Sequence, residues 1–249
     1  MSDPANSTLK HSIRNTYHPH ALWILSGVAL RMSQRAGIHR EKALANVSVF
    51  QAEIRRRTWW ALMSLDSRAA EIAGSGISVS HNAQDTEMPR NLNDCDLSPT
   101  MTELPQSRTG ATEMIFVSLR HEVSKLCRDN INAANSASGI SCYPYLTDSK
   151  LDEFEQLLEH KFLRFCDTLY PLHYITSIVG RACIGMMRLI MHHPCQHLNG
   201  ANGMSEEDKY SLLQLCFKSV KYHHLVHSTP ALASRYLWHC EGKYANPLR

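Results

Sequence analysis

Apolar residues recur along this chain every three or four positions, which is the spacing of amphipathic α-helices. The first such stretch spans residues 20–39, and Gly37 stands where a glycine often closes a helix. Further helical patterns cover residues 51–73, 111–130, 149–168, 171–192 and 205–227, and another apolar segment starts at residue 231. No alternating strand pattern of useful length occurs. The sequence therefore predicts an all-α fold, an irregular multi-helix array.

Three segments interrupt the helical pattern. Residues 74–108 are rich in Gly, Ser, Asn and Pro, and they predict a long loop after the second helix that wraps a surface. Residues 132–141 are small and polar, which is typical of a hinge or a disordered loop. Residues 1–16 are polar and predict a flexible N-terminus. We therefore expect one helical domain over residues 17–249.

The spacing also predicts which side of each early helix is buried. In the first helix this side carries Leu22, Leu25, Val28, Ala29, Met32 and Ala36. In the second it carries Ile54, Thr58, Ala61, Leu62, Leu65, Ala69 and Ile72. Trp59 and Trp60 face different directions, so the second helix is expected to pack on two sides. Asp148 or Ser149 is expected to cap one later helix, and Ser205 another.

The charged positions of the second helix predict scaffold contacts. Glu53 and Arg57 lie at i, i+4 on one edge of the apolar arc, a favourable pair that contributes about 0.2–0.5 kcal/mol when exposed. Arg56 is expected to point outward. Arg55 projects toward the apolar side, where it must reach water or a buried carboxylate. A structural role is favoured over a catalytic one.

Composition adds limits on function. Hydrophobic residues make up 43% of the 249 residues and charged residues 20%, which is typical of a globular protein. Lys and Arg exceed Asp and Glu by only 26 to 23, so DNA binding by this chain alone is not expected. The eight cysteines are scattered without a C-x-x-C pair, which indicates a reducing, intracellular compartment. The most apolar stretch, residues 175–191, contains Arg181 and Arg188, so no membrane contact is expected.

Two histidine-rich segments are candidates for metal binding. Residues 192–197, H-H-P-C-Q-H, offer four ligands, but a site needs further groups from elsewhere and a structural role is favoured. Residues 223–227, H-H-L-V-H, have the histidine spacing of a zinc hydrolase, but His224 replaces the general-base Glu. No nucleophile elbow, phosphate loop or dinucleotide motif occurs. We assign no metal, no cofactor and no catalytic residue.

Short motifs along the first hundred residues suggest a family. Residues 23–32 read W-I-L-S-G-V-A-L-R-M, residues 37–40 G-I-H-R, and residues 53–66 E-I-R-R-R-T-W-W-A-L-M-S-L-D. Residues 76–79, G-I-S-V, and 88–96, M-P-R-N-L-N-D-C-D, follow. In this order they resemble the fungal-specific transcription factor domain, the middle regulatory domain of zinc-cluster transcription factors, although the proline usually found after Gly76 is missing. Residues 170–194 are similar to a later part of members found beside secondary-metabolite genes.

The resemblance implies a helical domain that tunes transcription through ligands or partner proteins. It assigns a structural role to Trp23, Gly27, Arg31, Met32, Gly37, His39, Arg40, Glu53, Arg55, Arg56, Arg57, Trp59, Trp60, Asp66, Pro89 and Asp94. The cysteine pattern of the zinc cluster is absent from this sequence. We therefore expect a partial domain, truncated at both ends: either a partial gene product or a regulator that has lost its DNA-reading module.

The expected function is control of a fungal secondary-metabolite gene cluster in the nucleus, without enzymatic activity. The expected partners are regulatory proteins of the transcription machinery or a full-length regulator, together with a small-molecule effector. The alternative is a stand-alone helical interaction module that binds a regulator or a small ligand without touching DNA.

Overall fold

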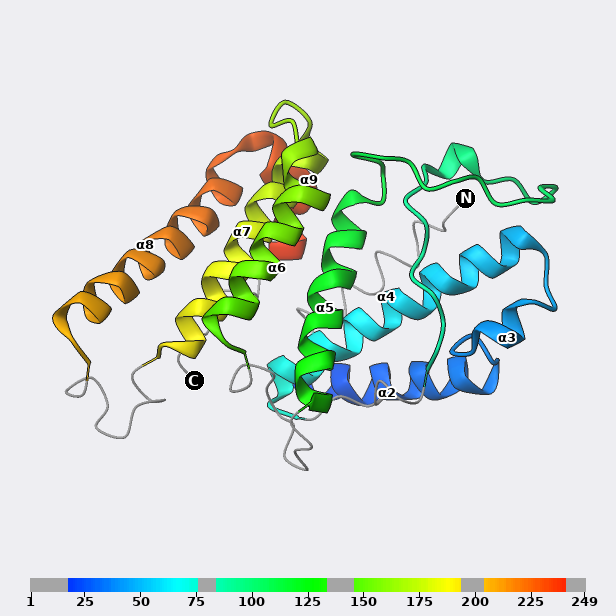
Figure 1. Ribbon diagram of the computed structural model, residues 1–249, viewed down its shortest axis with the longest axis horizontal. Helices are drawn as coiled ribbons and strands as arrows, with labels where there is room; N and C mark the ends of the chain where they lie inside the picture. The colour runs from blue at the N-terminus through cyan, green and yellow to red at the C-terminus, as the bar shows by residue number, and fades with distance from the viewer. Residues whose placement is uncertain (1–17, 76–83, 134–145, 194–203, 241–249) are drawn as a thin grey trace. The chain divides into compact units, whose positions relative to one another are not determined.

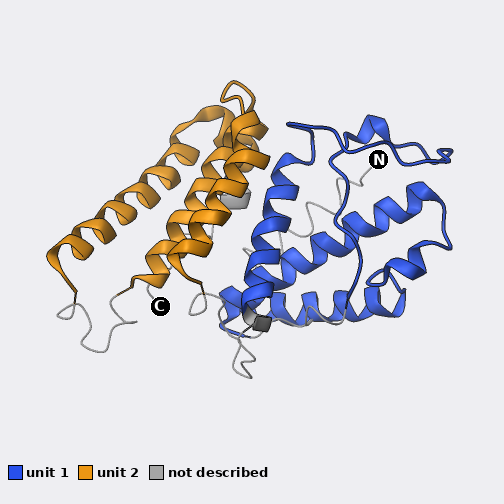
Figure 2. Ribbon diagram, viewed as in Figure 1, with its two compact units in different colours: residues 1–142 blue, residues 143–249 orange. Residues whose placement is uncertain are grey.

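The computed structural model describes residues 18–75, 84–133, 146–193 and 204–240. Within these ranges the regular elements are α-helices and short 3-10 turns, which confirms the all-α prediction (Figure 1). The chain divides into two compact units, residues 1–142 and 143–249 (Figure 2). The predicted flexible N-terminus and most of the predicted hinge lie outside the described residues.

Unit 1 contains helices α2 (Pro19–Arg35), α3 (Glu41–Leu44), α4 (Val49–Ala73) and α5 (Ile115–Ala133). The Ser48 hydroxyl caps α4 by accepting a hydrogen bond from the Gln51 N–H at 3.3 Å. Gly74 ends this helix with a left-handed φ of 62°. Helix α2 packs along α4, and α5 crosses it (Figure 1). The core cluster between α2, α3 and α4 consists of Leu30, Ile38, Leu44, Ala52, Trp59, Trp60 and Met63.

Unit 2 contains α6 (Asp148–Lys161), the turn η4 (Leu163–Phe165), α7 (Pro171–Met191), α8 (Glu206–Ser228) and α9 (Pro230–Cys240). Helix α7 contacts α6, α8 and α9. Arg188 of α7 donates to Asp152 at 2.6 Å and to Glu155 at 2.7 Å, both on α6. By length and composition α7 is the one candidate for a membrane span among the described residues, and half of its most apolar window is buried inside the protein.

Several helix ends differ from the prediction. Helix α2 ends at Arg35 instead of continuing to residue 39, although Gly37 does follow the end with a φ of 76°. The four-residue helix α3 is too short to leave a periodic signal. Helix α6 is capped by Thr147, one residue before the predicted Asp148 or Ser149. The Ser205 cap of α8 is confirmed, with a 3.1 Å bond from the Asp208 N–H.

The predicted buried sides of α2 and α4 are wrong at most positions. On α2 the exposed fractions are 49% for Leu25, 46% for Val28 and 69% for Met32. Leu22 is buried as predicted, and the rest of the buried side consists of Ser26, Gly27, Leu30 and Ser33. On α4 the buried side carries Ala52, Glu53, Trp59, Trp60, Met63, Ser64, Asp66, Ala69 and Ala70, so the predicted arc contributes only Ala69. The buried side of α4 is determined by the tryptophan rings and by the polar contacts of Glu53 and Asp66. A hydrophobicity pattern does not detect such contacts.

Candidate functional site

The carboxylate of Glu53 is the centre of a buried ion network in unit 1. Its side chain is 0% exposed, so the energy given above for an exposed pair does not apply to Glu53 and Arg57. Oε1 lies 3.3 Å from Arg57 Nε and 3.2 Å from the Arg90 backbone nitrogen, and Oε2 lies 3.8 Å from Arg56 Nη1. Burial raises the pKa of Glu53, while the two guanidinium groups and the Arg90 N–H act to lower it. Glu53 therefore depends on these partners in its buried position.

Arg56 joins α4 to α3. It does not point outward, contrary to the prediction. Its guanidinium donates to the Glu41 carboxylate of α3. Glu41 Oε2 also accepts a 3.0 Å bond from the Glu87 N–H. Burial acts to raise the pKa of Glu41, but the bonds from Arg56 and Glu87 outweigh it, so this pKa is lowered. One ion pair thus holds α3, α4 and the loop after α4 together.

Arg57 reaches the middle of the same loop. Its Nη1 donates to Asp94 Oδ1 at 2.7 Å, and its Nη2 donates to the Leu92 carbonyl at 3.2 Å. The Asp94 N–H in turn donates to Glu113 Oε2 at 2.7 Å, immediately before α5. Asp94 opens the short turn η2 (Asp94–Asp96). The contact joins an arginine of the residue 53–66 segment to an aspartate of the residue 88–96 segment.

Trp59 and Trp60 bind the first described residues of the loop after α4 through their indole N–H groups. Trp59 Nε1 donates to Gln84 Oε1 at 2.8 Å, and Trp60 Nε1 donates to the Glu87 carbonyl at 2.8 Å. Both rings are buried, with exposed fractions of 0% and 4%. The His39 ring packs on Trp59 with centroids 5.9 Å apart. The rings therefore fill the core with their apolar bodies and anchor the loop with their polar edges.

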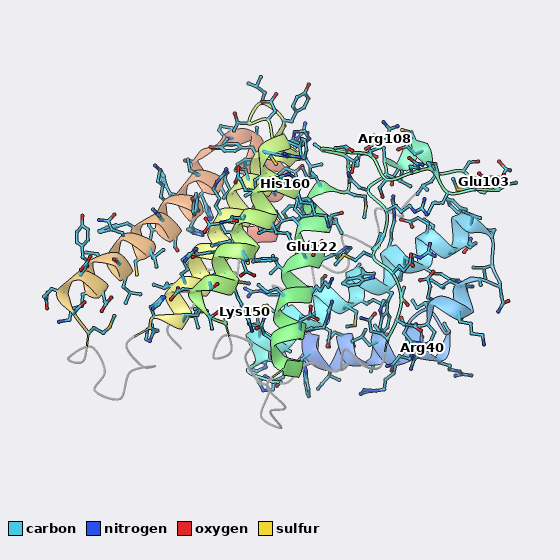
Figure 3. The ribbon with its side chains drawn as sticks, in the orientation of Figure 1. Arg40, Glu103, Arg108, Glu122, Lys150 and His160 are labelled. Carbon is cyan, nitrogen blue, oxygen red and sulfur yellow. The ribbon has the colours of Figure 1, made fainter. Side chains whose placement is uncertain are left out.

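The remainder of the loop is folded against itself around Asn91. The Asn91 amide donates to the carbonyls of Arg108 at 2.8 Å and Gly110 at 2.9 Å, and its oxygen accepts from Thr112 at 2.6 Å. Arg108 forms an ion pair with Asp96 and lies on the stretch of loop beside η2 (Figure 3). A segment without regular structure is thus fixed by side-chain bonds, which satisfy its backbone groups.

A second cluster surrounds Trp60 on the side of α5. The His121 ring centroid lies 5.7 Å from that of Trp60, and Arg128 Cζ lies 5.3 Å from it. Among the described residues, His121 Nε2 and the Arg128 guanidinium have no hydrogen-bond partner, and both side chains are buried. Burial, followed by the charges of Arg120 and Arg128, lowers the pKa of His121 to about 3. Burial lowers the pKa of Arg128 to about 10.

The structure brings together only part of the predicted motif set. His39, Glu53, Arg56, Arg57, Trp59, Trp60 and Asp94 contact one another or the loop, as described above. Asp66 is buried and accepts a 2.8 Å bond from the Ser26 hydroxyl, which ties α4 to α2. Arg31, Met32 and Arg40 are exposed (Figure 3 labels Arg40), and Trp23, Arg55 and Pro89 are partly exposed. Residues 76–79 lie outside the described residues.

Several residues of the network were not predicted. Glu41 lies in a helix too short to detect, and Thr86 binds the Ile38 carbonyl at 2.8 Å across a sequence distance that no local pattern reports. Asn91 lies inside the loop motif of residues 88–96, and its place in that motif could have identified it as part of the network. His121 and Arg128 are seven residues apart on α5, a helical spacing that could have placed them on one face.

The histidine-rich segments give no metal centre in the part of the chain that the structure describes. No group of three His, Cys, Asp or Glu side chains there is arranged to hold an ion. Residues 194–197 of the first segment lie outside that part. In the second segment the rings of His223 and His227 pack on each other, with centroids 4.3 Å apart. The network around Glu53 is thus the candidate site, and its geometry is that of a scaffold.

Comparison with known proteins places this scaffold among transcription regulators. The profile described as Fungal specific transcription factor domain matches residues 11–190. The aurofusarin cluster transcription factor of Gibberella zeae is 35% identical over 92% of this chain and 34% of its own length. The transcriptional regulator AacuB of Aspergillus aculeatus is 33% identical over 73% of this chain and 25% of its own length.

A third relative matches a shorter region. The pyriculol/pyriculariol biosynthesis cluster transcription factor 1 of Pyricularia oryzae is 40% identical over 46% of this chain and 15% of its own length. This chain therefore spans about a third or less of the length of these three relatives. No solved structure matches it.

Proposed function

Because the chain belongs to the family defined by the fungal specific transcription factor domain, we propose that it regulates transcription of the genes of a secondary-metabolite cluster. The observation that carries this proposal is the match to the aurofusarin cluster transcription factor across 92% of the chain. The Glu53 network lies within the residues that the family profile matches, and it binds a loop and offers no catalytic arrangement. A regulatory scaffold, not an enzyme, fits both observations.

The proposal includes a nuclear location and partners. Regulatory proteins of the transcription machinery, or a full-length regulator, would bind the helical surface, and no cofactor is needed for this role. A small-molecule effector is the second kind of partner. An anionic effector is supported by the cluster around Arg128, because a buried guanidinium that has no acceptor among the described residues is costly and an oxyanion would satisfy it.

The alternative function is a stand-alone interaction module that never reads DNA. Neither function requires that the purified chain select a DNA sequence by itself, and its net charge of +3 supplies few phosphate contacts. We expect only weak, salt-sensitive binding to promoter DNA of the neighbouring genes, equal to that of a scrambled duplex, at physiological salt. Fluorescence anisotropy with both duplexes measures this. Promoter binding about a thousandfold tighter than scrambled binding would eliminate the alternative.

A further inference from the structure

Helix α8 leaves an apolar stripe uncovered along one face. Its apolar members are Tyr210, Leu213, Phe217 and Val220, with exposed fractions of 64%, 50%, 61% and 65%. They are separated by three, four and three residues, which is the alternating spacing of a coiled-coil seam. The opposite face carries the buried Ser219 and Val226, and α8 contacts α7 and α9. The stripe is therefore additional to the surface that holds α8 in unit 2.

The charges of α8 change sign along the helix. Its first turn carries Glu206, Glu207 and Asp208, with Lys209 behind them paired to Glu206, while Lys218 and Lys221 lie in its second half. Glu207 and Lys221 are two heptads apart, so they lie on the same flank of the stripe, with Gln214 midway between them. All three are exposed, and within the described part of the chain Glu207 and Lys221 make no ion pair.

This arrangement is complementary to itself when a second α8 runs in the opposite direction. Placing Tyr210 against Val220 of the second copy, and Leu213 against its Phe217, closes the apolar seam. In that register Glu207 faces Lys221 of the second copy, and the two-fold axis repeats the pair. A parallel arrangement would instead bring the acidic first turns of both helices together.

We infer that the exposed stripe of α8 is a docking surface for the α8 of a second copy of this chain, paired in antiparallel orientation. Helix α8 begins after the residues 11–190 matched by the family profile, so the inference goes beyond the proposed regulatory function. Helix α2 also exposes apolar side chains, Leu25, Val28 and Met32, but the exposed charges beside them are Arg31 and Arg35. That face lacks the self-complementary charge pattern of α8.

The test is sedimentation velocity of the full chain over a concentration series. We expect a monomer–dimer equilibrium with a Kd on the order of 10 μM, as suits a single helix pair. The double variant Leu213→Ser with Phe217→Ser should weaken the dimer at least about tenfold, because it removes the centre of the seam. Leu169→Ser is the matched control, since Leu169 is an apolar side chain of unit 2 that is 86% exposed and lies outside the stripe. Its Kd should equal that of the wild-type chain.

Charge reversal distinguishes the orientation. Glu207→Lys and Lys221→Glu should each weaken an antiparallel dimer about three- to tenfold at low salt, and the double variant should restore it. A parallel dimer would instead be strengthened by Glu207→Lys. A chain that stays monomeric throughout the series would overturn the proposal, as would a dimer that is insensitive to the seam variant or strengthened by Glu207→Lys. None of these results bears on whether the chain controls transcription.

Discussion

Replacing Glu53 with Ala is expected to lower the free energy of unfolding of unit 1 by about 3–5 kcal/mol. The carboxylate is fully buried and is the common partner of Arg57, Arg56 and the Arg90 N–H. Its removal leaves two guanidinium groups beside a dry core without one of their acceptors. The loss should exceed that of an exposed ion pair by several-fold, because Ala leaves an unfilled space and an unpaired Arg90 N–H at a fully buried position, while Arg56 and Arg57 keep only Glu41 and Asp94 as acidic partners.

Urea unfolding followed by tryptophan fluorescence measures this loss, since three of the four tryptophans, at 23, 59 and 60, lie in unit 1. Glu53→Gln should lose less than Glu53→Ala, because the amide oxygen still accepts hydrogen bonds. Glu71→Ala is the matched control on the same helix. Glu71 pairs with Arg68 at the surface, so its loss should stay within about 0.5 kcal/mol. Equal effects of Glu53→Ala and Glu71→Ala would show that the network does not stabilise the fold.

Acidification is expected to destabilise unit 1 through His121. The folded pKa of about 3 lies below the unfolded value of 6.5, so between these values the unfolded chain binds the extra proton. The contribution of His121 is complete above pH 6.5 and declines as the pH falls toward the folded pKa. The slope approaches about 1.4 kcal/mol per pH unit below pH 6.5. Between pH 6.5 and 5 the lowered pKa of Glu41 contributes little, because its effect begins below about pH 4.5.

The free energies of unfolding at pH 6.5 and 5 test this prediction. His121→Phe keeps a ring against Trp60 but binds no proton, so its stability should fall less than that of the wild-type chain over this interval. His160→Gln is the control for replacing a histidine, because His160 is an exposed residue of α6 in unit 2 (Figure 3). If His121→Phe and the wild-type chain lose the same stability, His121 is not held neutral by burial.

The sequence predicted the helices of this protein better than their packing. Periodicity located each long helix because an apolar repeat of three to four residues exists whichever side is buried. It misplaced the buried sides of α2 and α4, because the pattern expects only apolar side chains to be buried. In the structure, the hydrogen-bonded side chains of Ser26 and Asp66 are buried. Leu25, Val28 and Met32 then remain exposed. A hydrophobicity pattern cannot identify a buried polar residue whose partner lies forty residues away.

The sequence indicated some residues of the candidate site but none of its long-range contacts. The family motif indicated Glu53, Arg57, Trp59 and Asp94, and the structure joins each of them to the loop or to the network. The outward prediction for Arg56 was wrong because its partner Glu41 belongs to a helix with no periodic signal. His121 and Arg128 were missed because their environment depends on Trp60 from another helix. Contacts between residues so far apart in the sequence can be identified only when the fold is known.

The measurement that most directly tests control of a gene cluster is RNA quantification of the genes neighbouring this one in the native fungus. Strains to compare are the wild type, a deletion, and deletions complemented with the wild-type, Glu53→Ala or Glu71→Ala gene. We predict that deletion shifts the neighbouring transcripts together, that the wild-type and Glu71→Ala genes restore them, and that Glu53→Ala does not. Unchanged transcripts in the deletion strain, under conditions where the cluster is expressed in the wild type and under conditions where it is silent, would contradict the regulatory function.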